Sequence, residues 1–131
     1  MTVLTIGAIA LLSYTASDPS MDQLLDAIRM VESSNGKNLI GDKGKAIGPY
    51  QIWESYWIDA MRILKKDWPY SDAMKEGRAR EAVKAYITHY GKGHGWEGMV
   101  RCHNGGPTGW KKKSTLVYLD KIKNALKEKK K

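Results

Sequence analysis

The sequence predicts a mainly α-helical protein with at most a small β-hairpin, and three observations support this fold class. Apolar residues recur at helical spacing in several segments, glycines gather in the turns between those segments, and no repeat or internal linker interrupts the chain. With 131 residues, of which 42% are hydrophobic, the chain is large enough for one domain with a single buried core. We therefore expect one domain over residues 18–131, preceded by a separate apolar segment over residues 1–17.

The first helix of this domain has a clear start signal. Asp18 and Pro19, followed by Ser20, supply a helix cap and a proline suited to the first turn. One apolar face then runs to Glu32 and consists of Leu24, Leu25, Ile28 and Val31. The glycines at positions 36, 41, 44 and 48 divide the following stretch into turns, where a short hairpin could form.

The same spacing predicts four more helices. We expect them over residues 51–64, 71–90, 96–102 and 114–127. Pro69 ends the region of the helix expected over residues 51–64, and Gly91 ends the helix expected over residues 71–90.

Residues 1–17 contain no charged side chain, and their apolar core is shorter than the roughly 20 residues of an ordinary membrane span. The segment has the length of the hydrophobic part of an export signal, with small residues for cleavage at positions 15–17, although no Lys or Arg precedes it. Two interpretations stay open. The segment is either an export signal or weak membrane anchor, or a buried N-terminal helix or strand.

The net charge of +8 favours anionic partners. Nucleic acid is one class of partner, and the anionic polymers of a bacterial envelope are another. Net charge alone does not distinguish between these two classes. Much of the excess lies in the lysines at 111–113 and in the tail 127–131, which also fit a plain solvated surface.

The positions of Glu32 and Asp42 in the sequence indicate a catalytic pair of carboxyl groups. Glu32 stands at the end of an apolar helix, where burial would raise the pKa of an acid, and Asp42 stands in a glycine-rich turn, where it would stay ionised. Cleaving a glycosidic bond needs such a pair: one neutral carboxyl to protonate the leaving oxygen, and one carboxylate to stabilise or capture the cationic sugar.

Several motifs occur in the same order as in a known family. They are Glu32-Ser33, the run from Asp42 and Gly44 to Gly48-Pro49-Tyr50-Gln51-Ile52, Tyr56-Trp57-Ile58-Asp59, and His103-Asn104-Gly105-Gly106-Pro107-Thr108-Gly109. With these motifs the chain resembles the invertebrate-type (destabilase-like) lysozymes from about residue 24 to residue 122. The resemblance implies a lysozyme-like helical domain with a small hairpin between Glu32 and Asp42.

The resemblance also implies roles for residues. Glu32 would be the general acid and Asp42 its partner carboxylate. Substrate would be bound by Ser33, Tyr50, Gln51, His103 and Asn104, with His103 facing the glutamate across the cleft. Trp53 and Trp110 could also line the sugar groove. We expect no cofactor and no metal, because no acidic or cysteine partner stands at ligand spacing from His89 or His94.

The chain departs from the family at two places. The family is rich in cysteine, whereas this sequence holds Cys102 alone, which we expect to be a buried small hydrophobe. Family members with isopeptidase activity carry serines before the Gly-Pro-aromatic-Gln motif and a lysine after it, where this chain has Lys45, Ala46 and Ile47 and then Trp53 and Glu54. We therefore expect that second activity to be absent.

Three functional classes remain. We favour a muramidase that hydrolyses the β-1,4 bond between N-acetylmuramic acid and N-acetylglucosamine. A lytic transglycosylase that uses Glu32 alone and leaves 1,6-anhydro ends is the alternative, and a basic module that only binds envelope or nucleic acid is the third. Asp42 and His103 favour hydrolysis.

The expected partners are peptidoglycan and its anionic polymers, with no nucleic acid, and with transient membrane association through residues 1–17. We expect a monomer that is secreted or acts in the periplasm or cell envelope. An enzyme encoded by a phage and released from the cytoplasm is also compatible, because a chain with one cysteine folds in a reducing cytosol.

Overall fold

The computed structural model describes residues 17–129. The expectations for an export signal, anchor or buried element over residues 1–17 therefore lie almost wholly outside the described residues. Among the helices that are described, none combines the length and the apolar character that crossing a membrane requires.

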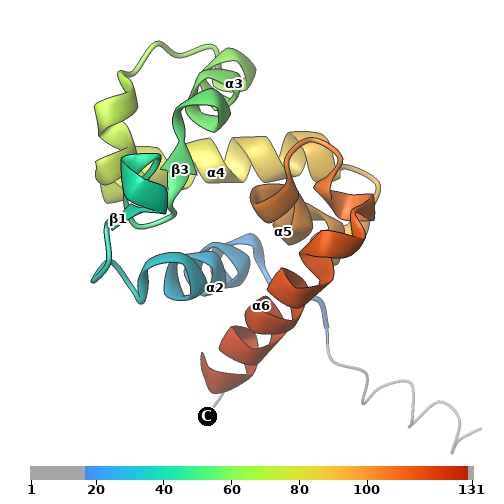
Figure 1. Cartoon of the computed structure of the whole chain (residues 1–131). Helices are drawn as coiled ribbons and strands as arrows, with labels where there is room; N and C mark the ends of the chain where they lie inside the picture. Colours follow the sequence, from blue (N-terminus) through green and yellow to red (C-terminus); the bar gives the residue numbers. More distant parts are fainter. Residues whose placement is uncertain (1–16, 130–131) are drawn as a thin grey trace, which may run out of the picture.

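The prediction of a mainly helical fold is confirmed (Figure 1). The α-helices are α2 (Met21–Ser33), α3 (Glu54–Leu64), α4 (Glu76–Gly91), α5 (Gly95–Gly105) and α6 (Leu116–Lys129). Helix α4 crosses the middle of the molecule and contacts α2, α3 and α5, while α2 and α6 lie side by side.

The start of α2 follows from a complete capping box. The Gln23 amide donates to the Ser20 hydroxyl at 3.1 Å, and the Ser20 amide donates to the Gln23 side chain at 2.8 Å. Such a cap contributes about 1 kcal/mol. The helix ends where Ser34 adopts a left-handed conformation, so Glu32 stands in the last turn.

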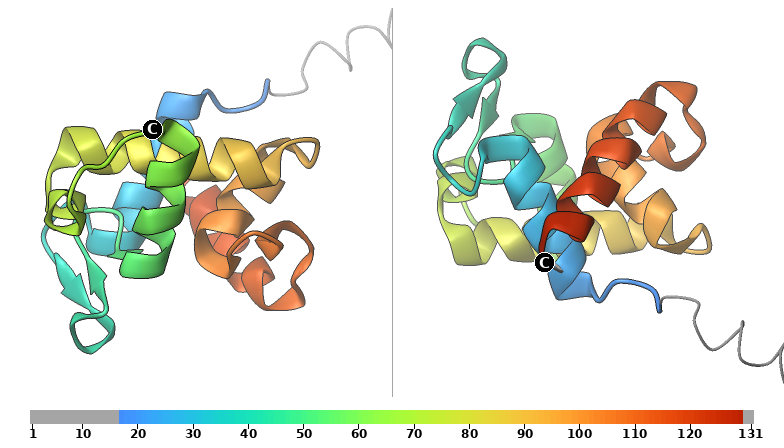
Figure 2. Two further views of the ribbon diagram at one scale, coloured as in Figure 1. Left: turned by 90° about the horizontal axis from the view of Figure 1, so that it is seen from above. Right: turned by 90° about the horizontal axis from the view of Figure 1, so that it is seen from below.

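The predicted hairpin is part of a slightly larger sheet. Three antiparallel strands of two residues each, β1 (Ile40–Gly41), β2 (Ala46–Ile47) and β3 (Ile52–Trp53), are arranged in the order β1-β2-β3. A 3₁₀ turn over Asp42–Gly44 joins the first two strands. Figure 2 shows this hairpin projecting beyond the helices.

Three predicted helix boundaries were wrong, and tertiary pairing explains the first. The helix expected from residue 51 begins at Glu54, because β3 pairs with β2 and Gln51 has a left-handed φ of 52°. The helix expected from residue 71 begins at Glu76, after a separate 3₁₀ turn (Tyr70–Met74) and an extended Lys75. Helix α5 runs on to Gly105, beyond the predicted end at residue 102.

The core lies between the helices and the small sheet. Its largest fully buried side chains come from all of these elements and include Leu24, Ile28, Tyr50, Ile52, Trp57, Val83, Ile87, Val100 and Ile122. Cys102 is free and fully buried, as predicted.

Candidate active site

Glu32 meets a buried histidine. From the last turn of α2 its Oε2 lies 3.2 Å from Nε2 of His103 on α5. The glutamate side chain is 21% exposed and the histidine side chain only 2%. The acid is therefore held against the protein interior while remaining open to a ligand.

Both ring nitrogens of His103 have polar partners. Its Nε2 also lies 2.9 Å from the Tyr50 carbonyl oxygen, and its Nδ1 lies 2.8 Å from the Tyr56 hydroxyl. A carbonyl oxygen only accepts, so the ring N–H at Nε2 donates to Tyr50. His103 thus donates to the Tyr50 carbonyl oxygen while the same nitrogen lies against the Glu32 carboxyl.

Tyrosines form the wall next to this pair. The ring of Tyr56 stacks on Tyr86 with 3.6 Å between centroids. Burial, then the neighbouring Tyr86 and Glu32, raise the pKa of Tyr56 well above its ordinary value. Burial and then the charge of Glu32 do the same for the pKa of Tyr118. Both hydroxyls therefore stay protonated at neutral pH.

An open cleft of about 440 Å³ begins at His103. Its lining residues come from α3, α4 and the end of α5, namely Trp53, Ser55, Tyr56, Asp59, Tyr86, His103, Asn104, Gly106 and Pro107. Aromatic rings suit the apolar faces of a sugar, while Asn104 and Ser55 offer hydrogen bonds to its hydroxyl groups.

Asp42 reaches the same cleft through a tryptophan. It is exposed in the hairpin turn, and the Trp53 indole N–H donates to its Oδ2 at 3.3 Å. Trp53 is itself 44% exposed and lines the cleft. Glu32 is thus connected to the cleft by His103, and Asp42 by Trp53.

A second carboxylate in the cleft was missed at the sequence level. Asp59 lines the cleft, accepts a hydrogen bond from the Tyr90 hydroxyl and pairs with Arg62. It stands three residues after Tyr56, so both project from one face of α3. That spacing within the Tyr-Trp-Ile-Asp motif was the signal that could have identified it.

Three predicted substrate-binding residues, Ser33, Tyr50 and Gln51, do not line the cleft, and the side chains of the first two are buried. Ser33 is 1% exposed, and its hydroxyl donates to the Pro49 carbonyl at 2.7 Å. Tyr50 is fully buried. Neither the Ser33 nor the Tyr50 side chain is exposed to the cleft in this structure, and each holds the chain that surrounds the site.

Tyr50 is buried by a charged network that the sequence did not reveal. Its hydroxyl donates to Glu76 at 2.6 Å and accepts from Arg80 at 3.0 Å. Arg29 pairs with Glu76, and Asp22 pairs with Arg80. The network fixes the residue whose carbonyl oxygen holds His103.

The other predicted residues differ in whether they line the cleft. Gln51 donates its side-chain amide to the Gly48 carbonyl at 3.0 Å and so braces the loop before β3. Asn104 is exposed and lines the cleft beside His103. Of the tryptophans proposed for the groove, Trp53 lines it, whereas Trp110 stacks on His94.

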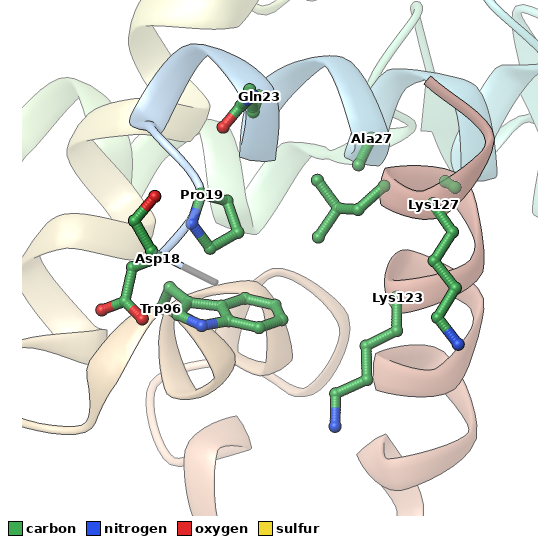
Figure 3. Close-up of a pocket in the computed structure, with 10 residues that line it drawn as sticks. Asp18, Pro19, Gln23, Ala27, Trp96, Lys123 and Lys127 are labelled. Atoms are coloured by element: carbon green, nitrogen blue, oxygen red, sulfur yellow. The ribbon is translucent and has the colours of Figure 1, made fainter. Parts of the chain in front are cut away.

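A second hollow, of about 370 Å³, lies between the start of α2, α5 and α6 (Figure 3). Pro19, Ala27 and Trp96 give it apolar walls, and Lys123 and Lys127 stand at its side. Asp18 is its one acidic lining residue, so it lacks the carboxyl and histidine pair found at Glu32. Within residues 17–129 no group of three or more His, Cys, Asp or Glu side chains is placed to hold a metal ion.

The fold and the site are those of a small helical protein with one carboxyl held at an aromatic cleft, and known proteins share both. The Destabilase family model matches residues 21–125. A lysozyme from Ostrea edulis is 37% identical over 95% of each chain.

Two solved structures are also similar. A chain in the crystal structure of Aeromonas hydrophila PliI in complex with Meretrix lusoria lysozyme has 33% identity and a TM-score of 0.68, over 84% of this chain and 93% of that one. The Tapes japonica lysozyme has 30% identity and a TM-score of 0.65, over 81% and 92%. The protein described here belongs to the Destabilase family, whose model spans Glu32, Asp42 and His103.

Proposed function

We propose that this protein is a muramidase, a glycoside hydrolase that cleaves the β-1,4 bond between N-acetylmuramic acid and N-acetylglucosamine in peptidoglycan. The observation that carries the proposal is the Glu32 carboxyl held by His103 at the end of an aromatic cleft. The similar proteins named lysozyme, which match over most of the chain, support it.

Glu32 acts as the general acid. Its proton passes to the glycosidic oxygen as the bond from that oxygen to the sugar C1 breaks, and the leaving sugar departs as an alcohol. The His103 N–H then donates to the new carboxylate. A water molecule completes the reaction at C1 and returns a proton to Glu32.

Asp42 is the partner carboxylate. A group that stabilises a cationic sugar must carry a charge that is not already neutralised. Asp59 is paired with Arg62 and accepts from Tyr90, whereas the partner seen for Asp42 is the neutral indole N–H of Trp53. Asp42 therefore keeps its charge available beside the cleft, next to Trp53, although Asp59 lines the cleft and Asp42 does not.

The substrate surface is anionic, and the net charge of +8 draws the protein to it. We propose residues 18–131 as the catalytic domain, working as a monomer on the cell envelope after secretion. The cleft residues Asn104 and Trp53 bind the sugar, and Gln51, Ser33 and Tyr50 hold the loop that supports His103.

Analysis of the ends of digested peptidoglycan tests this function. Hydrolysis leaves reducing muramic acid ends, a lytic transglycosylase leaves 1,6-anhydro ends, and a binding module leaves the polymer intact. We expect reducing ends from the wild-type protein.

Asp42→Asn and Asp59→Asn form the matched pair for the second carboxyl. We expect Asp42→Asn to cost at least about 10²-fold, and Asp59→Asn less than about tenfold. Near-normal turnover by Asp42→Asn with anhydro ends would replace hydrolysis by the transglycosylase mechanism, and the reverse order of losses would make Asp59 the partner.

A further inference from the structure

Tyr118 carries a buried hydroxyl group that makes no full hydrogen bond in the resting protein. The residue lies on α6 and is 7% exposed. Among residues 17–129 its Oη is the one buried side-chain nitrogen or oxygen atom without a hydrogen-bond partner. Burying a hydroxyl without a partner costs free energy, so its presence needs a reason.

The Tyr118 hydroxyl lies beside the acid. Helices α2 and α6, which carry Glu32 and Tyr118, pack against each other (Figure 1). The Tyr118 ring centroid is 6.3 Å from that of His103, whose Nε2 contacts Glu32. After burial, the charge of Glu32 and a hydrogen-bonding interaction with its carboxyl raise the pKa of Tyr118, so the hydroxyl already faces the carboxyl although its geometry falls short of a full hydrogen bond.

The other groups around Glu32 are already engaged. The Tyr56 hydroxyl is used by His103 Nδ1 at 2.8 Å. His103 Nε2 donates to the Tyr50 oxygen at 2.9 Å, which is closer to it than Glu32 at 3.2 Å. A glutamate that has just lost its proton therefore has room for a further donor, because a carboxylate can accept several hydrogen bonds.

We propose that Tyr118 is a positioning residue for the acid: its O–H donates a hydrogen bond to the Glu32 carboxylate that forms when the proton leaves for the glycosidic oxygen. This inference rests on the proposed role of Glu32. No proton moves from the tyrosine. The hydrogen bond forms mainly with the ionised acid, so it favours the state after proton transfer over the resting state.

Tyr118→Phe removes the oxygen alone. Because the hydroxyl makes no full hydrogen bond in the resting protein, we expect the thermal midpoint to stay the same or rise. The ionised carboxyl loses a donor, so the Glu32 titration midpoint, followed by carboxyl ¹³C NMR, should rise by about 0.5 to 1 pH unit. On peptidoglycan, kcat should fall about 3- to 10-fold with KM unchanged, and the basic limb of the pH profile should move upward.

Tyr70→Phe is the matched control. The Tyr70 hydroxyl donates to the Ile52 carbonyl at 2.6 Å, away from Glu32, so this variant should lose stability without moving the Glu32 midpoint. The inference is overturned if folded Tyr118→Phe keeps the wild-type Glu32 midpoint, or if Tyr70→Phe moves the midpoint equally. Absence of cleavage by the wild-type protein would refute the muramidase function instead, and the NMR midpoint still decides whether Tyr118 acts on Glu32.

Discussion

Replacing Tyr50 by phenylalanine removes one oxygen atom from the network behind the cleft. The resemblance to lysozymes implied that this tyrosine binds sugar, whereas the structure buries it and uses its hydroxyl between Glu76 and Arg80. The two roles predict different results. A sugar contact affects KM and leaves stability alone, while a structural role affects stability and leaves KM alone.

The size of the effect follows from the two hydrogen bonds. Bonds to charged groups contribute about 1.5–3 kcal/mol each, but Glu76 and Arg80 keep other partners and remain partly exposed, at 47% and 25%. Water and the remaining partners recover part of the loss, so we expect about 1–2 kcal/mol in total. At roughly 3–5 °C per kcal/mol for a domain of this size, the thermal midpoint should fall by about 3–10 °C.

Differential scanning calorimetry and steady-state kinetics on one soluble peptidoglycan fragment measure both quantities. We expect a lower midpoint, an unchanged KM and a kcat reduced several-fold, since the Tyr50 carbonyl orients His103. A raised KM at unchanged thermal midpoint would refute the structural assignment and restore the sugar-binding role.

Two further predictions concern pH and salt. The pKa of Tyr56 and Tyr118 is raised by burial above the ordinary value near 10, so the folded state keeps these protons to higher pH than the unfolded state does. Their contribution to stability is full below about pH 10 and is lost as pH rises further, and the free energy of unfolding in urea should fall from about pH 9 to about pH 11. A constant value over that range would contradict the buried assignment of both hydroxyls. Activity on whole cell walls should fall steeply as the Debye length shrinks from about 10 Å at 0.1 M salt to about 3 Å at 1 M, while cleavage of a short uncharged chitin-type oligosaccharide changes little. Equal salt dependence on both substrates would show that the basic surface does not target the protein.

Local signals predicted the elements that depend on local chemistry. Ser20 with Gln23 marks the start of α2 because both halves of the capping box lie within one turn. The glycine-rich turns predicted a hairpin, but its third strand depends on pairing between β2 and β3, which competes with the helical spacing of residues 51–53. At residues 51–53 strand pairing therefore outweighed the helical pattern of the sequence.

The residues of the candidate site likewise fall into those that local motifs predicted and those whose position depends on tertiary packing. Glu32, Asp42 and His103 stand in motifs that are readable in one sequence. The burial of Tyr50 depends on Glu76 and Arg80, and the place of Tyr118 depends on how α6 packs on α2, so no local pattern marks either. Asp59 lies between these cases, since its spacing from Tyr56 is local while its position in the cleft is tertiary.

The central claim is that Glu32 delivers the proton, and Glu32→Gln tests it most directly. The amide keeps the shape of the side chain but has no acidic proton, and Glu81→Gln, at an exposed position on α4, is the matched control. With both variants folded, we expect peptidoglycan turbidity clearance to fall at least about 10²-fold in Glu32→Gln and to be unchanged in Glu81→Gln. Retention of more than about a tenth of wild-type clearance by folded Glu32→Gln would contradict the assignment of Glu32 as the acid.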